Sequence, residues 1–270
     1  MKQFILRRDP AGENGEVCLT GEEFHYLAHV RRARAGDTLD CRLPSGASAF
    51  LRIKRIEKNA LIAECTVKSG ETHLQTGFPS LILFQSMAKG AKMDMIVRQA
   101  GEAGVTEIAP FYSERSIPRR SASAVEDASA INIDTERLRR WRRISIEARQ
   151  QSGSSIATSV KHPQNFDELL NYWECLKNQY KNPLALLIHE TPLAKSGFHR
   201  YLDTIPELVV LAVGPEGGFS IAEALAFMNA GFKPVTLGDT ILRTESAALY
   251  SIAVVRTLIF ERRMWTTANL

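Results

Sequence analysis

Long apolar runs are missing from this chain of 270 residues. No stretch reaches the roughly 20 consecutive apolar residues that are needed to cross a bilayer. The segment Met1–Arg8 carries charges where a secretory signal would have its apolar stretch. The sequence therefore predicts a cytoplasmic protein without a membrane anchor.

Cysteine is scarce, and the four residues are scattered along the chain at Cys18, Cys41, Cys65 and Cys175. No pair has the spacing of metal ligands or of a redox motif. We expect all four to be small, buried core residues. His25 and His29 can share one helical face, but further zinc ligands are missing nearby. We therefore expect no metal centre.

Two common nucleotide-binding signatures are also absent. The chain has no Gly-x-Gly-x-x-Gly motif followed about 20 residues later by an acid, and no glycine-rich loop ending in Gly-Lys-Ser/Thr. These absences argue against a Rossmann dinucleotide site and against a phosphate-binding loop. The net charge of +4 permits a polyanionic partner without proving one.

The amino-terminal part, up to about Lys68, is predicted to be mostly β. Apolar and polar residues alternate over 49–56 and 61–67, with a plausible hairpin turn at Lys58-Asn59. A short helix is expected over 21–32, with Thr20 as N-cap and Glu23 at capping-box spacing. We expect a small barrel-like domain over 1–72, followed by a second domain over 73–270.

Residues 69–79 are predicted to be a linker, and the pattern then changes to alternating strands and helices. Strands are expected at 81–84, 107–111, 184–188, 208–213 and 235–237. Helices are expected at 93–103, 134–151, 166–173, 221–230 and 246–261. This order indicates an α/β fold with a mostly parallel sheet that is covered on both faces. Residues 120–133 are expected to form a mobile excursion.

A glycine-rich turn directly follows the apolar run 208–213. It comprises Gly214-Pro215-Glu216-Gly217-Gly218-Phe219-Ser220, and a second loop over 237–247 opens a long apolar helix. Turns at the carboxyl ends of strands are where open α/β sheets bind ligands. The glycines either hold a ligand or only form a tight turn. Ser220 with Glu223 fits a capping box, and the role of Glu216 stays open.

Arginines provide candidate contacts to a polyanion. Arg243 lies between core-forming Leu242 and a helix start, so it either contacts RNA or pairs with Glu216 or Glu245. The helix from Asp134 has Leu138, Trp141, Ser145 and Ala148 on one face and its arginines largely opposite. These arginines either form a solvated face or, as we favour, contact RNA phosphates. The apolar helix over 247–260 is predicted to be central to the fold or to form a subunit interface.

Several blocks together resemble one family, the ribosomal RNA small subunit methyltransferase E family of the knotted SPOUT methyltransferases. The blocks are 25–32 with Gly36-Asp37, 89–94 with 100–108, 113–116, 141–144 with 150–153, and the two loops 214–220 and 237–247. The similarity runs along most of the chain, in order and at compatible spacings.

The resemblance implies methyl transfer from S-adenosylmethionine to N3 of a uridine in 16S ribosomal RNA, within the RNA or the assembled 30S subunit. It also implies a PUA-like RNA-binding amino-terminal domain, a trefoil knot in the carboxyl-terminal domain, and a homodimer that uses the apolar helix. The implied cofactor-binding residues are Val213, Gly214, Pro215, Glu216, Gly217, Leu237, Gly238, Ile241, Leu242, Thr244 and Ala247.

Arg243 is the candidate catalytic residue, because positive charge near the base oxygens would stabilise the developing uridine anion. The candidate RNA-binding residues are Arg31, Arg32, Lys89, Lys92, Arg115, Arg139, Arg142 and Arg143. The chain departs from the family at Thr240 and Ser154, where relatives often have a basic residue. These departures keep two alternatives open, a changed RNA target and an RNA-binding protein without catalysis. Nucleotide hydrolysis is a weaker third alternative.

Overall fold

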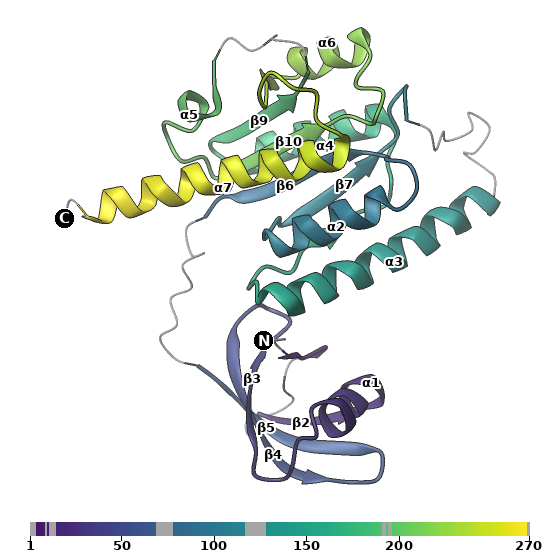
Figure 1. Ribbon diagram of the computed structural model, residues 1–270, viewed down its shortest axis with the longest axis vertical. Coiled ribbons are helices and arrows are strands. Elements are labelled where there is room, and N and C mark those ends of the chain that lie inside the picture. Colours follow the sequence, from purple (N-terminus) through teal and green to yellow (C-terminus); the bar gives the residue numbers. More distant parts are fainter. Residues whose placement is uncertain are drawn as a thin grey trace. The chain divides into compact units, whose positions relative to one another are not determined.

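The chain folds into two compact units. The computed structural model describes residues 4–8, 10, 15–68, 78–116, 128–190, 193 and 196–268. One unit comprises residues 1–76 and 149–157, and the other comprises 77–148 and 158–270 (Figure 1). The return of 149–157 to the first unit was not predicted. The expected boundary at 72/73 and most of the expected linker lie outside the described residues.

The first unit is a mixed, five-stranded half-barrel, which agrees with the predicted β domain. Its strands are β1 (Phe4–Ile5), β2 (Glu16–Thr20), β3 (Thr38–Arg42), β4 (Ser48–Ile56) and β5 (Ala60–Val67), in the order β1-β3-β4-β5-β2. All neighbours are antiparallel except β1 and β3. Alternate residues of β4 are buried, as the period-two pattern predicted.

The expected helix of this unit starts at Gly21 with Thr20 in the N-cap position, as predicted, but the capping box is missing. It consists of α1 (Gly21–His25) and a π-helical segment, η1 (Tyr26–Val30). Thr20 makes no capping hydrogen bond, and the Glu23 carboxylate instead accepts the backbone N–H of Arg7 at 2.9 Å. The predicted capping box is therefore wrong, because a residue distant in sequence uses the glutamate.

Arg149 is a second departure, since it was expected on the solvated face of its helix. Its side chain is buried and donates hydrogen bonds only to backbone carbonyls. The acceptors are those of Ser154 at 3.2 Å, Ser155 at 3.1 Å, and Leu43 and Pro44 at 3.5 Å each. Arg149 therefore fastens the segment 149–157 to the turn that follows β3.

We predict that Arg149→Met lowers the free energy of unfolding of the first unit by about 2–4 kcal/mol, because several buried carbonyls lose their donor. Arg139→Met is the matched control, since Arg139 is exposed on the same helix. It should change stability by less than about 0.5 kcal/mol. Chemical denaturation followed by circular dichroism measures both variants. Equal stability of the two would contradict the role given to Arg149.

The second unit contains an all-parallel, six-stranded sheet, where a mostly parallel sheet with five strands was expected. The order is β11-β9-β10-β6-β7-β8. The strands are β6 (Ser80–Ser86), β7 (Glu107–Phe111), β8 (Ser159–Val160), β9 (Pro183–Ile188), β10 (Leu208–Val213) and β11 (Lys233–Val235). β11 ends where the predicted strand 235–237 begins. β8 was not predicted, because two residues carry no readable periodicity.

Helices cover both faces of this sheet (Figure 1). One face packs against α2 (Lys92–Glu102), α3 (Ala128–Ser152), α5 (Phe198–Tyr201) and α7 (Thr244–Ala268). The other packs against α4 (Phe166–Gln179) and α6 (Ile221–Asn229). Successive residues of β10 enter opposite cores, as their alternation requires. Residues 128–133 belong to α3, so the expected excursion over 120–133 is wrong there. Residues 120–127 lie outside the described residues.

The cysteine prediction is confirmed for two residues and wrong for two. Cys41 and Cys65 are buried, whereas Cys18 and Cys175 are exposed. Cys18 lies in β2, where burial alternates, so its apolar neighbours occupy the inner face and it occupies the outer one.

Among the described residues, no group of His, Cys, Asp and Glu could hold a metal ion. None of the described helices is long and apolar enough to cross a membrane.

Candidate functional site

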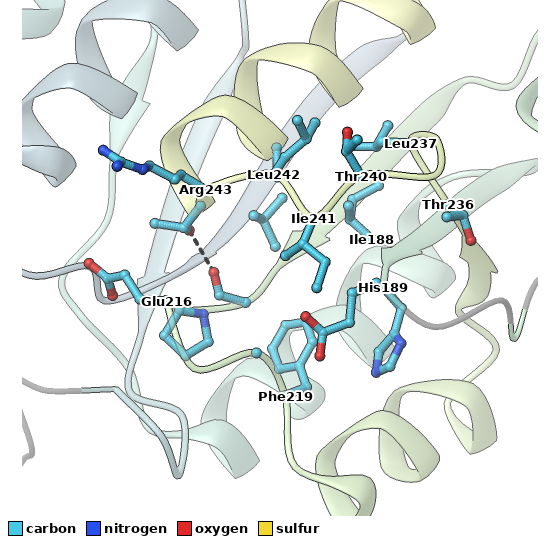
Figure 2. A pocket seen from close by; sticks show the side chains of 17 residues that line it. Ile188, His189, Glu216, Phe219, Thr236, Leu237, Thr240, Ile241, Leu242 and Arg243 are labelled. Carbon is cyan, nitrogen blue, oxygen red and sulfur yellow. Dashed lines mark hydrogen bonds between the residues drawn. The ribbon is translucent and has the colours of Figure 1, made fainter.

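A cavity of about 220 Å³ lies where β9, β10 and β11 end. The glycine turn after β10 forms one wall, and the loop leading into α7 forms another (Figure 2). The end of β9 and the two residues after it complete the lining. Because these strands are parallel, their carboxyl ends meet at one edge of the sheet, which is where such sheets bind ligands.

Most of the predicted cofactor residues line this cavity. They are Val213, Gly214, Pro215, Glu216, Leu237, Ile241, Leu242, Thr244 and Ala247, together with the catalytic candidate Arg243. Gly217 and Gly238 are not among the lining residues. Residues that the predicted set omitted also line it, namely Ile188, His189, Glu190, Gly218, Phe219, Thr236 and Thr240. Their common signal is position, since each lies at or just beyond a strand end or inside one of the two loops.

The middle of the cavity is apolar. The side chain of Ile241 projects from the loop over 237–247 into the cavity (Figure 2), and 78% of its surface is exposed. Leu242 is half-buried and packs against the core. The alternative in which both side chains simply enter the core is therefore wrong for Ile241. An apolar side chain held in the open beside a cavity provides a surface for a flat, weakly polar ligand group.

The backbone conformation of the glycine turn depends on Gly218. Its φ is +67°, and a Cβ built there would lie 3.4 Å from the Oε1 atom of Glu190. An L side chain is strained in this conformation. The glycine therefore lets the turn pass close to the Glu190 carboxylate, which belongs to the cavity lining.

The capping box at the start of α6 is confirmed. The Ser220 hydroxyl accepts the backbone N–H of Glu223 at 3.2 Å, and the Glu223 carboxylate accepts that of Ser220 at 2.9 Å. Glu223 is buried, and its second oxygen accepts the backbone N–H of Glu114 at 2.8 Å. The carboxylate thus joins the glycine turn to the segment that follows β7.

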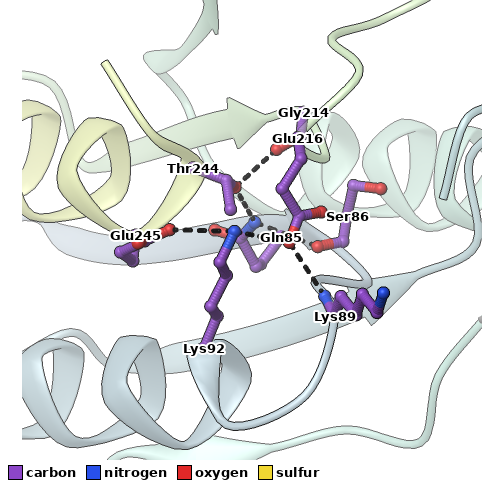
Figure 3. Close-up of polar contacts among 8 residues, drawn as sticks. All are labelled: Gln85, Ser86, Lys89, Lys92, Gly214, Glu216, Thr244 and Glu245. Carbon is purple, nitrogen blue, oxygen red and sulfur yellow. Dashed lines mark hydrogen bonds and ion pairs between the residues drawn. The ribbon is translucent and has the colours of Figure 1, made fainter. Parts of the chain in front are cut away.

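Glu216 is held by the start of α2 rather than by Arg243. Its Oε1 atom accepts the backbone N–H of Lys89 at 3.1 Å and the Nζ of Lys92 at 2.8 Å (Figure 3). The Lys92 ammonium also lies 3.8 Å from a carboxylate oxygen of Glu245. Both acids proposed as partners of Arg243 therefore pair with Lys92. In the part of the chain that the structure describes, neither pairs with Arg243.

The pKa of Glu216 is lowered. Burial alone would raise it, but the hydrogen bonds from Lys92 and from backbone N–H groups outweigh this effect. A carboxylate whose pKa is lower in the folded state stabilises the fold above its unfolded pKa. That stability is lost as the pH falls through the folded value. The contribution of the pair to stability is therefore present at neutral pH and disappears in acid.

We predict that Lys92→Met lowers the free energy of unfolding at neutral pH by about 1–2 kcal/mol, since two acids lose their cation. The difference from the unchanged protein should shrink as the pH falls below the ordinary range of a glutamate. Lys89→Met is the matched control, because Lys89 reaches Glu216 through its backbone N–H and keeps that bond. Denaturation at several pH values measures both variants. A constant difference across the pH range would contradict this assignment.

The predicted RNA-contacting cations have different surroundings. Arg115 is exposed and donates a hydrogen bond to the carbonyl of Gly217 at 3.1 Å, so it lies against the glycine turn. Lys89 and Arg243 are also exposed. Lys92 is instead occupied by two carboxylates, so its RNA contact stays a prediction that this pairing does not favour.

The α3 helix presents its arginines as predicted, with exceptions. The predicted inner face is confirmed, since Leu138, Trp141, Ser145 and Ala148 are buried. Arg139, Arg142 and Arg143 are exposed. Arg143 lies 3.7 Å from Glu147, and Arg140 pairs with Asp94 of α2. Acids therefore compensate part of the positive charge on this face of α3.

Arg31 and Arg32 belong to the first unit, at the end of η1. Arg32 is exposed and has a φ of +53°, a conformation that few residues other than glycine adopt. Their predicted RNA contact stays a prediction.

Comparison with known proteins identifies the family. The RNA methyltransferase domain family matches residues 76–256, and the RNA methyltransferase PUA domain family matches residues 19–64. A ribosomal RNA small subunit methyltransferase E from Synechocystis sp. is 31% identical over 247 residues, which cover 90% of this chain and 73% of that protein. The chain belongs to the ribosomal RNA small subunit methyltransferase E family.

Two further relatives agree with this assignment. Ribosomal RNA small subunit methyltransferase E 2 of Borreliella burgdorferi is 28% identical over 260 residues, covering 96% of this chain and 98% of that protein. The crystal structure of a ribosomal RNA small subunit methyltransferase E from Neisseria gonorrhoeae was determined with S-adenosyl methionine bound. It is 27% identical, has a TM-score of 0.73, and the match covers 96% of this chain and 98% of that one. The predicted family, PUA-like unit and methyltransferase unit are thereby confirmed.

Proposed function

We propose that this protein transfers a methyl group from S-adenosylmethionine to N3 of a uridine in 16S ribosomal RNA. The observation that carries the proposal is the convergence of two loops on one cavity with an exposed apolar centre at Ile241. These loops are among the blocks through which the sequence resembles its family. The names of the relatives, and the cofactor in the Neisseria structure, support methylation of small-subunit ribosomal RNA from S-adenosylmethionine.

The residues around the cavity fit such a cofactor. The glycine turn and the loop over 237–243 offer backbone amides and carbonyls for a purine edge, while Ile241 and Leu242 offer an apolar face. Glu190 offers a carboxylate for hydroxyl or ammonium groups. When bound, the sulfonium supplies an electrophilic methyl group. The protein then has to hold the target base in line with it and exclude competing nucleophiles.

Arg243 is the proposed catalytic cation. Loss of the N3 proton leaves negative charge on the uridine oxygens, and a nearby guanidinium stabilises that charge. Arg243 lines the cavity and is exposed, and both acids that could have neutralised it are paired with Lys92. Arg115 and Lys89 lie beside the glycine turn and its contacts, where they suit RNA phosphates. Arg31, Arg32, Arg139, Arg142 and Arg143 are proposed as further RNA contacts.

We predict that Arg243→Ala keeps cofactor affinity within about twofold and lowers methyl transfer by at least about 100-fold, because only transition-state charge loses its partner. The measurement combines calorimetric binding of S-adenosylmethionine with transfer of a labelled methyl group to 30S subunits that lack this modification. Mass spectrometry of the nucleosides should detect 3-methyluridine. Arg200→Ala is the control for a general loss of positive charge, because Arg200 is exposed, lies on α5 and is not among the proposed RNA contacts.

The same experiment separates the alternatives. Full activity of Arg243→Ala would remove Arg243 from the mechanism. A different methylated nucleoside would indicate a changed target, and cofactor and RNA binding without any methyl transfer would indicate a binding protein. The trefoil knot and the cytoplasmic location stay predictions.

We also propose a homodimer formed through α7. One side of this helix packs on the sheet, while Tyr250, Ala253, Thr257, Phe260 and Met264 are exposed. These residues follow one another at intervals of three and four, which is the spacing of a helix–helix seam. An exposed, mainly apolar stripe of this length is typical of a surface covered by another protein.

We predict that Phe260→Glu weakens dimerisation by at least about tenfold, since it places an unpaired charge in the seam. Sedimentation at several protein concentrations measures the monomer–dimer equilibrium. Ile221→Glu is the control, because Ile221 is more exposed, at 79% against 45%, but lies on α6. A chain that is monomeric without any substitution, or a dimer that tolerates Phe260→Glu, would contradict the proposed interface.

A further inference from the structure

A buried hydrogen-bond relay connects the two cavity loops to β6. Nε2 of Gln85 donates to the Thr244 hydroxyl at 3.0 Å, and that hydroxyl donates to the carbonyl of Gly214 at 2.6 Å (Figure 3). Gly214 begins the glycine turn, and Thr244 begins α7. The Gln85 side chain thus joins β6 to Thr244, which lies 159 positions further along the chain.

The direction of every proton in this relay is determined by elementary chemistry. A carbonyl oxygen cannot donate, so the only hydroxyl proton of Thr244 must go to Gly214. The Thr244 oxygen can then only accept from Gln85. The other N–H of Gln85 Nε2 is directed to the carbonyl of Ser86 at 3.0 Å, which again can only accept. Both amide protons are therefore needed, and only an amide nitrogen at this position supplies them.

The relay lies beside the cavity, but its Gln85 end is not part of the cavity surface. Gln85 is fully buried, is the penultimate residue of β6, and is not among the cavity-lining residues, whereas Thr244 and Gly214 are. It pairs in register with Val213, the last residue of β10. Its Oε1 atom has no hydrogen-bond partner among the described residues. A buried, unpaired polar atom is costly, so the fold retains this amide for its two donors.

We propose that Gln85 is a positioning residue for the cofactor site. By donating to Thr244, it directs the hydroxyl proton to Gly214 and holds the glycine turn against the start of α7. The inference rests on the proposed cofactor function and extends it, because it assigns cofactor affinity to a side chain that does not line the cavity. Weakening the relay separates the two loops and lowers affinity while all cofactor contacts remain in the sequence.

Gln85→Glu is the most selective test, because it replaces the side-chain nitrogen by an oxygen and leaves the size of the side chain almost unchanged. An ionised carboxylate can only accept hydrogen bonds. It would therefore accept the hydrogen bond of the Thr244 hydroxyl, and the Gly214 carbonyl would lose its donor. A protonated carboxyl has one proton, so it can restore the bond to the Thr244 hydroxyl but not the second bond to the Ser86 carbonyl, and burial raises the pKa of such a group. We expect its dissociation constant for S-adenosylmethionine to be at least about tenfold weaker at about pH 9. Affinity should recover in part toward about pH 6, because the bond to Thr244 returns and the bond to Ser86 does not.

Substitutions at Thr244 provide the matched control and a second route if Gln85→Glu fails to fold. Thr244→Ser keeps the hydroxyl and should bind more tightly than Thr244→Val, which keeps the shape without the hydroxyl and should bind at least about tenfold more weakly than the unchanged protein. In the Thr244→Val background, Gln85→Glu should cost nothing further, because it acts through the hydroxyl. Calorimetry with S-adenosylmethionine measures all of these, and thermal unfolding checks that each variant is folded.

The outcomes are distinct. Wild-type binding together with a pH-dependent loss in Gln85→Glu and rescue by Thr244→Ser supports the relay. Wild-type binding with a Gln85→Glu affinity that is unchanged at every pH overturns it, as does a loss that adds fully to that of Thr244→Val. Equal affinity of Thr244→Ser and Thr244→Val overturns it as well. A wild-type chain that binds no cofactor overturns the proposed function and this inference with it.

Discussion

The burial of β10 between two parallel neighbours is the constraint on which the site depends. Every residue of this strand is buried, and it pairs in continuous register with β6 on one side and β9 on the other. A strand held on both edges and both faces cannot slip, because a shift of one residue would exchange its two faces. The glycine turn therefore starts at a fixed point beside the ends of β6 and β9. This point determines where the cavity lies.

A single lysine interacts with both acids that could otherwise pair with Arg243. Lys92 pairs with Glu216 of the glycine turn and approaches Glu245 in the first turn of α7. An acid in the first turn also interacts favourably with the helix dipole. Both acids are engaged from the side of α2, so neither of them compensates the charge of Arg243 at the cavity edge. The pairing thus does two things at once, since it joins three elements and leaves the arginine available for an anionic partner.

Sequence reasoning found the features that depend on neighbouring residues and missed those that depend on distant ones. The buried strand 208–213, the turn after it and the capping box at Ser220 follow from local pattern, and all are present. The capping box expected at Thr20 failed because Arg7, distant in sequence, takes the Glu23 carboxylate. The partner of Glu216 was missed for the same reason, since Lys92 lies 124 positions away. Periodicity describes one element and contains no information about which side chains meet across a fold.

The two departures from the family pattern differ in physical character. Ser154 is buried, its hydroxyl accepts the N–H of Ile156 at 3.2 Å, and its carbonyl accepts from Arg149. A long basic side chain would have to leave this turn, so the serine is part of the packing of the first unit. Thr240 is exposed and lines the cavity. A basic residue at this position would displace no packed atoms and would lie at the cavity. Any difference in target between this chain and its relatives is therefore better traced to Thr240 than to Ser154.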